Sequence, residues 1–164
     1  MYLVFLLATS TFLGFFFDSA VPNVKDNRLE GRWELESFEN EGIKKDASDP
    51  KTSFHGQRIQ IKGNRWVEWY DGTDAPPVHA KDTKFHCVTK PGMPFKHFDY
   101  WPIGSDGKPD TWKKIGIYKL DGDRLLVCFR VEQVAGESVD RPRKFDASKG
   151  KSTGLAIYKR IKSK

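Results

Sequence analysis

The stretch LEGRWELESF at 29–38 decides the fold of this chain. Apolar and charged residues alternate through it, which is typical of a β-strand that buries one face. Trp33 carries an indole that buries a large apolar area on folding, so we expect it to lie in the core. Gly31 leaves room for the chain to pass close to its neighbours. The stretch therefore predicts the first strand of a β-sheet core.

Seven further stretches carry the same signs of β-structure, because β-branched and aromatic residues are separated by Gly, Pro, Asp and Asn. They lie at 55–62, 65–71, 82–89, 95–101, 114–120, 123–131 and 153–160. Alternation within them predicts which side chains face the core. The core-facing sets expected on this basis are Ile59 and Ile61, Ile115 and Ile117, Leu125, Val127 and Phe129, and Leu155 and Ile157.

The connections favour neighbouring antiparallel strands. KGNR at 62–65 and DGD at 121–123 are tight hairpin signals, since glycine adopts the positive φ that such turns need. Two longer loops are expected at 102–113 and 132–152. A row of antiparallel strands hides its edges by closing on itself. The predicted fold class is therefore all-β, an eight-stranded antiparallel up-and-down β-barrel.

Gly31, Trp33 and Arg160 together resemble the closure of lipocalin-superfamily barrels. In that superfamily an arginine from the last strand packs over the tryptophan that plugs the barrel floor. A guanidinium over an indole face gains a cation–π contact. We therefore expect Gly31, Trp33 and Arg160 to be the structural closure.

A closer resemblance covers most of the chain after its N-terminus. LEGRWELESFENEGIKK, IGIYKLDGDRLLVCF and DRPRKFDASKGKSTGLAIYKR are similar to the lipocalin-like domain family abundant in planctomycete bacteria. The matching elements include Arg141, Pro142 and Phe145 of an R-P-x-x-F motif. The resemblance implies a small, usually exported lipocalin-like β-barrel of unsettled biochemical role, here at 21–164, and it brings no catalytic residues.

The N-terminus predicts export. Residues 1–17 carry no charge and are followed by small residues, so 1–20 read as a signal peptide cleaved after Ala20. The alternative is a short N-terminal anchor that is retained. Either way, the expected location is secreted or in the cell envelope or periplasm. The net charge of +6 favours anionic surroundings.

Residues with catalytic or metal-binding potential form no recognisable motif. His55, His79, His86 and His97 lack metal-site spacing. GKST at 150–153 ends like a phosphate-binding loop, but Phe145 occupies the position of its first glycine, and no serine lies in G-x-S-x-G. Glu68 and Asp99 lie in strands where they could face a cavity. We expect no enzyme activity and no catalytic, metal or cofactor-binding residues.

The two cysteines, Cys87 and Cys128, lie on predicted strands separated by two others, too far apart for a disulfide. Cys128 alternates with Leu125, Val127 and Phe129, so it is expected to point away from the core.

Aromatic residues gather in the third to fifth predicted strands. The candidate ligand-binding residues are Trp66, Trp69, Phe85, Phe98, Tyr100 and Trp101. They predict a pocket for a small apolar or amphiphilic ligand, with Lys96, Lys108, Lys113 and Lys114 near an anionic head group. The alternative is a packed barrel that acts as an envelope or extracellular interaction module for an anionic polymer or partner protein. A monomer with no nucleic-acid partner is expected in both cases.

Overall fold

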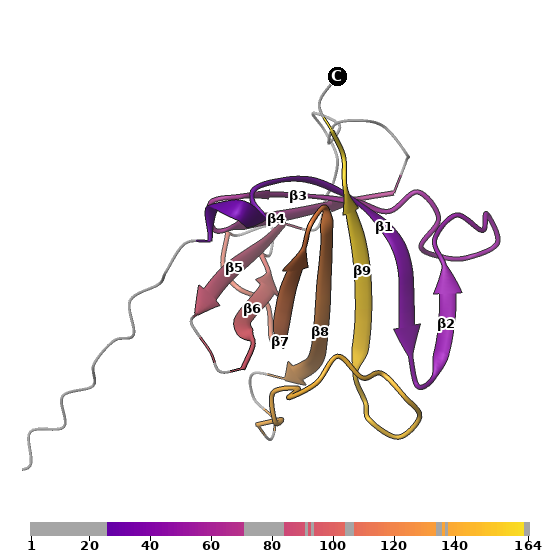
Figure 1. The fold of residues 1–164 in the computed structure, drawn as a ribbon. Coiled ribbons are helices and arrows are strands. Elements are labelled where there is room, and N and C mark those ends of the chain that lie inside the picture. The colour runs from indigo at the N-terminus through magenta and orange to yellow at the C-terminus, as the bar shows by residue number, and fades with distance from the viewer. Residues whose placement is uncertain are drawn as a thin grey trace, which may run out of the picture.

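The computed structural model describes residues 26–70, 84–90, 92, 94–103, 107–133, 136 and 138–162, with only the backbone described at 84–88. This part of the chain is almost entirely β-structure, with one short 3-10 helix, η1, at Asn27–Leu29 (Figure 1). Within it, no helix has the length and apolar character needed to cross a membrane. The predicted signal peptide or anchor at 1–20 lies outside the described residues.

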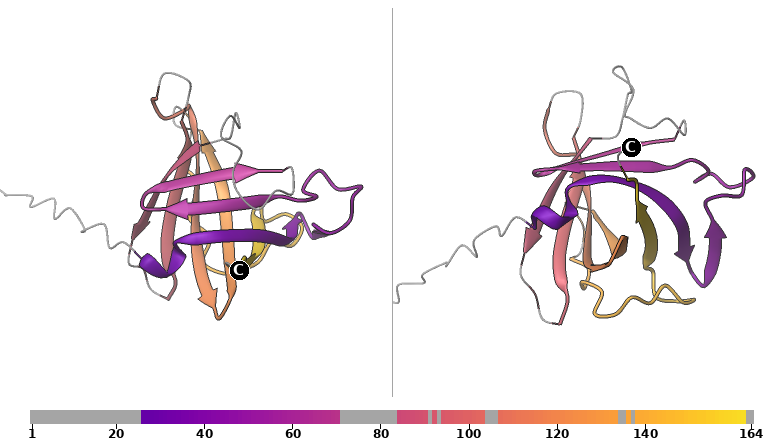
Figure 2. Two further views of the ribbon diagram at one scale, coloured as in Figure 1. Left: turned by 90° about the horizontal axis from the view of Figure 1, so that it is seen from above. Right: turned by 45° about the horizontal axis from the view of Figure 1, so that its top comes forward.

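Nine antiparallel strands form one sheet in the described part of the chain. They are β1 Gly31–Asn40, β2 Ile43–Asp46, β3 Arg58–Lys62, β4 Arg65–Trp69, β5 Lys84–Lys90, β6 Lys96–Pro102, β7 Trp112–Asp121, β8 Arg124–Gln133 and β9 Gly154–Arg160. The order is β2-β1-β3-β4-β5-β6-β7-β8-β9, and β1 also pairs with β9. The sheet is therefore strongly curled, and Figure 2 shows β1, β3 and β4 crossing the orange strands β7 and β8.

The all-β antiparallel fold is confirmed, and each of the eight predicted strands is present. The predicted closed eight-stranded up-and-down barrel is wrong, because the described residues form a curled, half-barrel sheet of nine strands. The extra strand, β2, forms a hairpin with β1. Its turn uses Glu41 and Gly42 at φ of 51° and 74°. Two successive positive φ values are typical of a two-residue hairpin turn.

Strand β1 bends because it has an irregularity in its pairing with β9 between Leu35 and Ser37. Such a bulge shifts the alternation of side chains by one residue. Trp33 and Leu35 face the core before it, and Phe38 packs against the core after it. The first half of β1 pairs with β3 and the second half with β2. One strand therefore belongs to both crossing parts of the sheet.

The core fills the inside of the curl, mainly with residues that alternate along the strands. The expected core faces of β3 and β8 are correct, but those of β7 and β9 are wrong. The inward side chains there include Tyr118 and Tyr158, while Ile115 and Ile117 lie outside the core cluster. Burial alone does not distinguish the two faces of β7, because Ile117 lies on the outer face and is still only 2% exposed.

The 138–153 segment covers part of that outer face. Arg141 anchors it by donating from Nη1 to the backbone oxygens of Phe98 (3.0 Å) and Gly116 (2.6 Å). The Nη2 atom of Arg141 lies 2.6 Å from the Asp99 carboxylate, and Phe145 packs edge-on against Phe95 at 4.9 Å between centroids. The R-P-x-x-F motif is thus a device that fastens the segment to the sheet.

Cys128 is a free cysteine that lies on the outer side of β8, as expected, but is fully buried. Its Sγ lies 4.0 Å from the backbone oxygen of Asp146 in the covering segment. Burial raises the pKa of the Cys128 thiol. Strands β6 and β7 separate its strand from β5, which carries Cys87.

Candidate functional site

One end of the core, which we call the capped end, is sealed around Trp33. The indole is fully buried and donates from Nε1 to the backbone oxygen of Leu29 at 3.0 Å. The Arg160 guanidinium lies 4.0 Å from the centroid of the indole. Arg160 also donates to the backbone oxygens of Glu30 (2.8 Å) and Arg28 (2.5 Å). The guanidinium is therefore held by both a ring face and two carbonyls.

Gly31 makes that arrangement possible. Its φ is +132°, and a Cβ at this position would lie 2.7 Å from Nη1 of Arg160. A side chain would therefore both strain the backbone and displace the guanidinium. The role of Gly31 is to let Arg160 reach the cap.

Three of the predicted ligand-binding residues lie together inside the curl. Trp66 stacks on Phe98 and Tyr100 with centroids 6.1 and 5.1 Å apart, and Phe98 and Tyr100 stack at 5.2 Å. The space left between Trp66, Phe98 and neighbouring core residues is about 10 Å³. That is about the room of one water molecule, so these rings mainly fill one another's space.

The other three predicted ligand-binding residues do not join this stack. Trp69 is buried but lies outside the core cluster. Trp101 is half-buried and alternates with Tyr100 along β6. The backbone of Phe85 pairs with Trp66, and its side chain lies outside the described residues. The sequence therefore placed these residues on the correct strands, but it did not predict which of them share the inner face.

The opposite end of the core, which we call the open end, is built around Lys114. Its Nζ lies 4.5 Å from the ring centroid of Phe129, 4.9 Å from that of Tyr100 and 5.9 Å from that of Trp112. Val131, the partner of Lys114 on β8, is 49% exposed, so solvent reaches this end. Burial lowers the pKa of Lys114, and the charge of Glu68 opposes that shift.

Glu68 is the acidic group of the open end. It accepts hydrogen bonds from Trp66 Nε1 (2.9 Å), Gln57 Nε2 (3.4 Å) and the Tyr70 hydroxyl (3.4 Å). Burial and the Glu68 charge raise the pKa of Tyr70 well above its usual range. Glu68 was predicted as a possible cavity residue, and Lys114 was predicted only as one of four lysines near an anionic head group, because Lys113 and Lys114 differ solely in which face of β7 they occupy.

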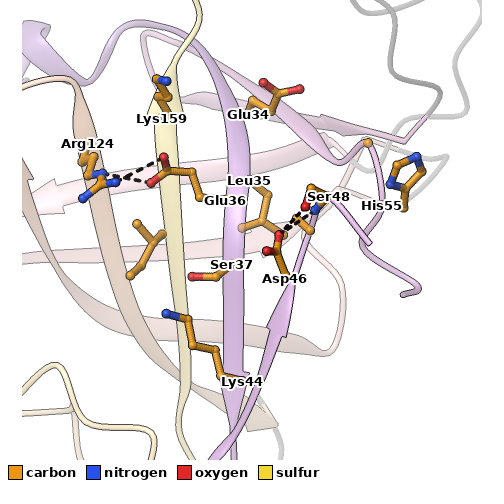
Figure 3. Close-up of a pocket in the computed structure, with 13 residues that line it drawn as sticks. Glu34, Leu35, Glu36, Ser37, Lys44, Asp46, Ser48, His55, Arg124 and Lys159 are labelled. Carbon is orange, nitrogen blue, oxygen red and sulfur yellow. Dashed lines mark hydrogen bonds and ion pairs between the residues drawn. The ribbon is translucent and has the colours of Figure 1, made fainter. Parts of the chain in front are cut away.

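A groove of about 940 Å³ lies on the outside of the sheet, between the outer faces of β1, β8 and β9 and the β2 hairpin with the loop after it (Figure 3). Figure 3 shows Lys159 and Lys44 toward its two ends, with Ser37 between them. The groove was not predicted because β2 was not predicted: Glu41-Gly42 is not one of the dipeptides that typically mark a two-residue hairpin.

The carboxylates of the groove are held by neighbouring groups. Glu36 pairs with Arg124 at 3.0 Å, and Glu34 pairs with Arg58 at 3.1 Å. Asp46 accepts from the Ser48 amide and hydroxyl, both at 2.8 Å, and these hydrogen bonds lower its pKa. Within the described ranges, the ammonium groups of Lys44 and Lys159 form no hydrogen bond or ion pair. The groove therefore offers two ammonium groups beside two carboxylates that are paired with arginines, while the third carboxylate, Asp46, keeps its charge.

A second groove, of about 530 Å³, lies between the start of β6 and the 138–153 segment, with His97, Arg141 and Arg143 in its walls. Burial and the charge of Arg141 lower the pKa of His97. Asp99, on the same outer face, pairs with Arg141 and with Lys90. Within the described part of the chain, no three His, Cys, Asp or Glu side chains gather as a metal site would require.

No protein-family profile matches the sequence, and comparisons with curated proteins and with solved structures likewise give no match.

Proposed function

We propose that this chain is an exported, non-enzymatic interaction module that binds an anionic polymer of the cell surface in the groove beside β2. Residues 1–20 direct export, and 21–164 form a lipocalin-like domain in which Trp33 and Arg160 make the closure. The interior then acts as a scaffold rather than as the binding site. Support for this comes from the stacked rings of Trp66, Phe98 and Tyr100, which leave about 10 Å³ near them.

The observation that carries the proposal is the pair of ammonium groups at Lys44 and Lys159 in a groove of about 940 Å³. The neighbouring carboxylates of Glu34 and Glu36 have arginine partners, so they repel an incoming anion less than free carboxylates would. Two separated cations suit a chain with regularly repeated negative charges. The net charge of +6 adds a long-range attraction for such a chain.

The test compares binding of an inorganic polyphosphate and a polyuronate with binding of neutral dextran, by titration calorimetry at low and high salt. We expect the wild type to bind both polyanions, more weakly at high salt, and not to bind dextran. The Lys44→Ala/Lys159→Ala variant should bind about 2- to 30-fold more weakly, since each exposed ion contact contributes about 0.2–1 kcal/mol.

Lys62→Ala is the matched control, because Lys62 is an exposed lysine on β3 that does not line the groove. Its affinity should fall much less than that of the double variant. Equal losses in the two variants, or no binding of either polyanion by the wild type, would overturn the proposal.

A second candidate function is binding of a small apolar or amphiphilic molecule at the open end. One observation favours it: Val131, the strand partner of Lys114, is 49% exposed, and Tyr70, which donates to Glu68, is 50% exposed. Titration with a fluorescent fatty-acid analogue tests it. Saturable tryptophan quenching that is lost in Trp112→Ala supports this candidate, and the absence of saturation rejects it.

A further inference from the structure

We propose that Lys114 captures small apolar aldehydes and ketones as an imine at the open end of the core. This activity is separate from polymer binding in the outer groove, because the two sites lie on opposite faces of the sheet. The inference stands on the position of one amine, on the rings around it and on the access of solvent to that position.

The position is set by alternation along β7. Tyr118 lies in the core, and a Cβ at Gly116 would point toward the core rings of Phe98 and Phe129. Lys114, two residues before Gly116, is on the same face of β7. Its backbone pairs with Tyr100 on one side and with Val131 on the other. Lys114 is itself partly exposed and its partner Val131 is half-exposed, so this side chain faces the inside of the sheet close to solvent.

The surroundings of Lys114 are those in which an amine becomes a nucleophile. Three ring faces lie within 6 Å of Nζ and exclude much of the water that would hydrate an ammonium ion. Lost hydration favours the neutral amine, and lysines in apolar pockets are activated in this way. Glu68 and the ring faces favour the charged form, but burial is the stronger effect on the pKa of Lys114.

The chemical step needs no cofactor and no redox partner. The neutral amine of Lys114 attacks the carbonyl carbon, and the π electrons of the C=O bond move to oxygen. Proton transfer from nitrogen to oxygen through solvent gives a carbinolamine. Loss of one water molecule then forms the C=N bond, so the amine and the carbonyl compound yield an imine and water. Tyr100 and Trp112 offer flat faces, which favour an aromatic or short alkyl carbonyl compound.

The test exposes the folded wild-type protein to benzaldehyde with cyanoborohydride at pH 7 and maps the trapped secondary amines by peptide mass spectrometry. We expect Lys114 to be labelled faster than the exposed Lys62, because burial favours the neutral amine of Lys114. Labelling of Lys114 no faster than Lys62 would overturn the proposal.

Lys113 is the adjacent comparison. It points to the outer face and lies 2.8 Å from the Glu132 carboxylate, so it should be labelled slowly. The preference for Lys114 should vanish in urea, and the total fast labelling should vanish in Lys114→Arg, which keeps the positive charge but lacks the amine chemistry. A preference that persists in the unfolded chain would also overturn the proposal, because it would be a property of local sequence.

Discussion

The two ends of the core each place a cation against aromatic rings, yet they differ in what fixes that cation. Arg160 at the capped end lies 4.0 Å from the Trp33 centroid and donates to two backbone carbonyls. Lys114 at the open end lies 4.5 Å from the Phe129 centroid beside a solvent-exposed rim. The same contact therefore belongs to the structure at one end and is available for chemistry at the other.

Trp33→Ala should reveal the largest difference in stability between the two ends. Removing a fully buried indole should lower the free energy of unfolding by about 3–5 kcal/mol. Trp112→Ala at the open end should cost about 1–2 kcal/mol, because that ring is only partly buried. Urea unfolding of both variants measures the two losses. Equal losses would mean that the two ends support the fold alike.

Gly31→Ala should have the next largest effect, about 2–3 kcal/mol. The new Cβ would meet the Arg160 guanidinium in a backbone conformation that alanine rarely adopts. Gly154→Ala is the comparison at the open end, where the Cβ would lie 2.8 Å from a ring edge of Phe129. We expect about 1 kcal/mol there, since the ring can shift toward the open side. A larger loss for Gly154→Ala in thermal unfolding would contradict the comparison.

Arg160→Ala and Lys114→Met should change the free energy of unfolding by different amounts or in opposite directions. Arg160→Ala should cost about 1–2 kcal/mol through the lost ring contact and packing. Lys114→Met should stay within about 1 kcal/mol of wild type, because relief of a buried charge offsets the lost ring contacts. Chemical denaturation of the two variants gives both values.

A double-mutant cycle tests the cap itself. Trp33→Ala and Arg160→Ala should couple by about 0.5–1.5 kcal/mol, since the two side chains touch. Additive losses would show that the contact contributes nothing to stability.

Asp26 should give the smallest effect, and one that depends on pH. Burial opposes its ionisation, but hydrogen bonds from Arg28 and Lys96 outweigh burial and hold the pKa of Asp26 far below its usual range. A depressed pKa stabilises the folded state above the unfolded value of about 3.9, and this contribution is lost as the pH falls below it. Asp26→Asn should therefore cost up to about 1 kcal/mol at pH 7 and less at pH 3. A loss of equal size at both values of pH would contradict this assignment.

The strands were predictable because each follows its own local pattern. The eight predicted stretches match β1 and β3–β9 to within a few residues. Strand β2 was missed because four exposed residues, Ile43–Asp46, carry no alternation of apolar and polar side chains. Without β2, the groove that holds Lys44 could not be foreseen.

The faces of β7 were not predictable from the same pattern. Ile115 and Ile117 mark an apolar face, but the 138–153 segment covers it, so both faces of the strand are buried. An alternation rule assumes that one face meets water. Here the opposite face carries Lys114, which its sequence context marks as a surface residue.

By itself, the sequence determined β1 and β3–β9, the hairpin turns at 62–65 and 121–123 and the residues of the cap, because alternation, turn chemistry and the glycine-tryptophan pair act over a few neighbouring residues. Only the tertiary structure decided which face of each strand is inside, where the bulge in β1 redirects Phe38, and that Lys114 lies among rings while Lys113 faces outward. These features depend on contacts between residues far apart in the chain. Local alternation gives two faces to every strand, and packing chooses between them.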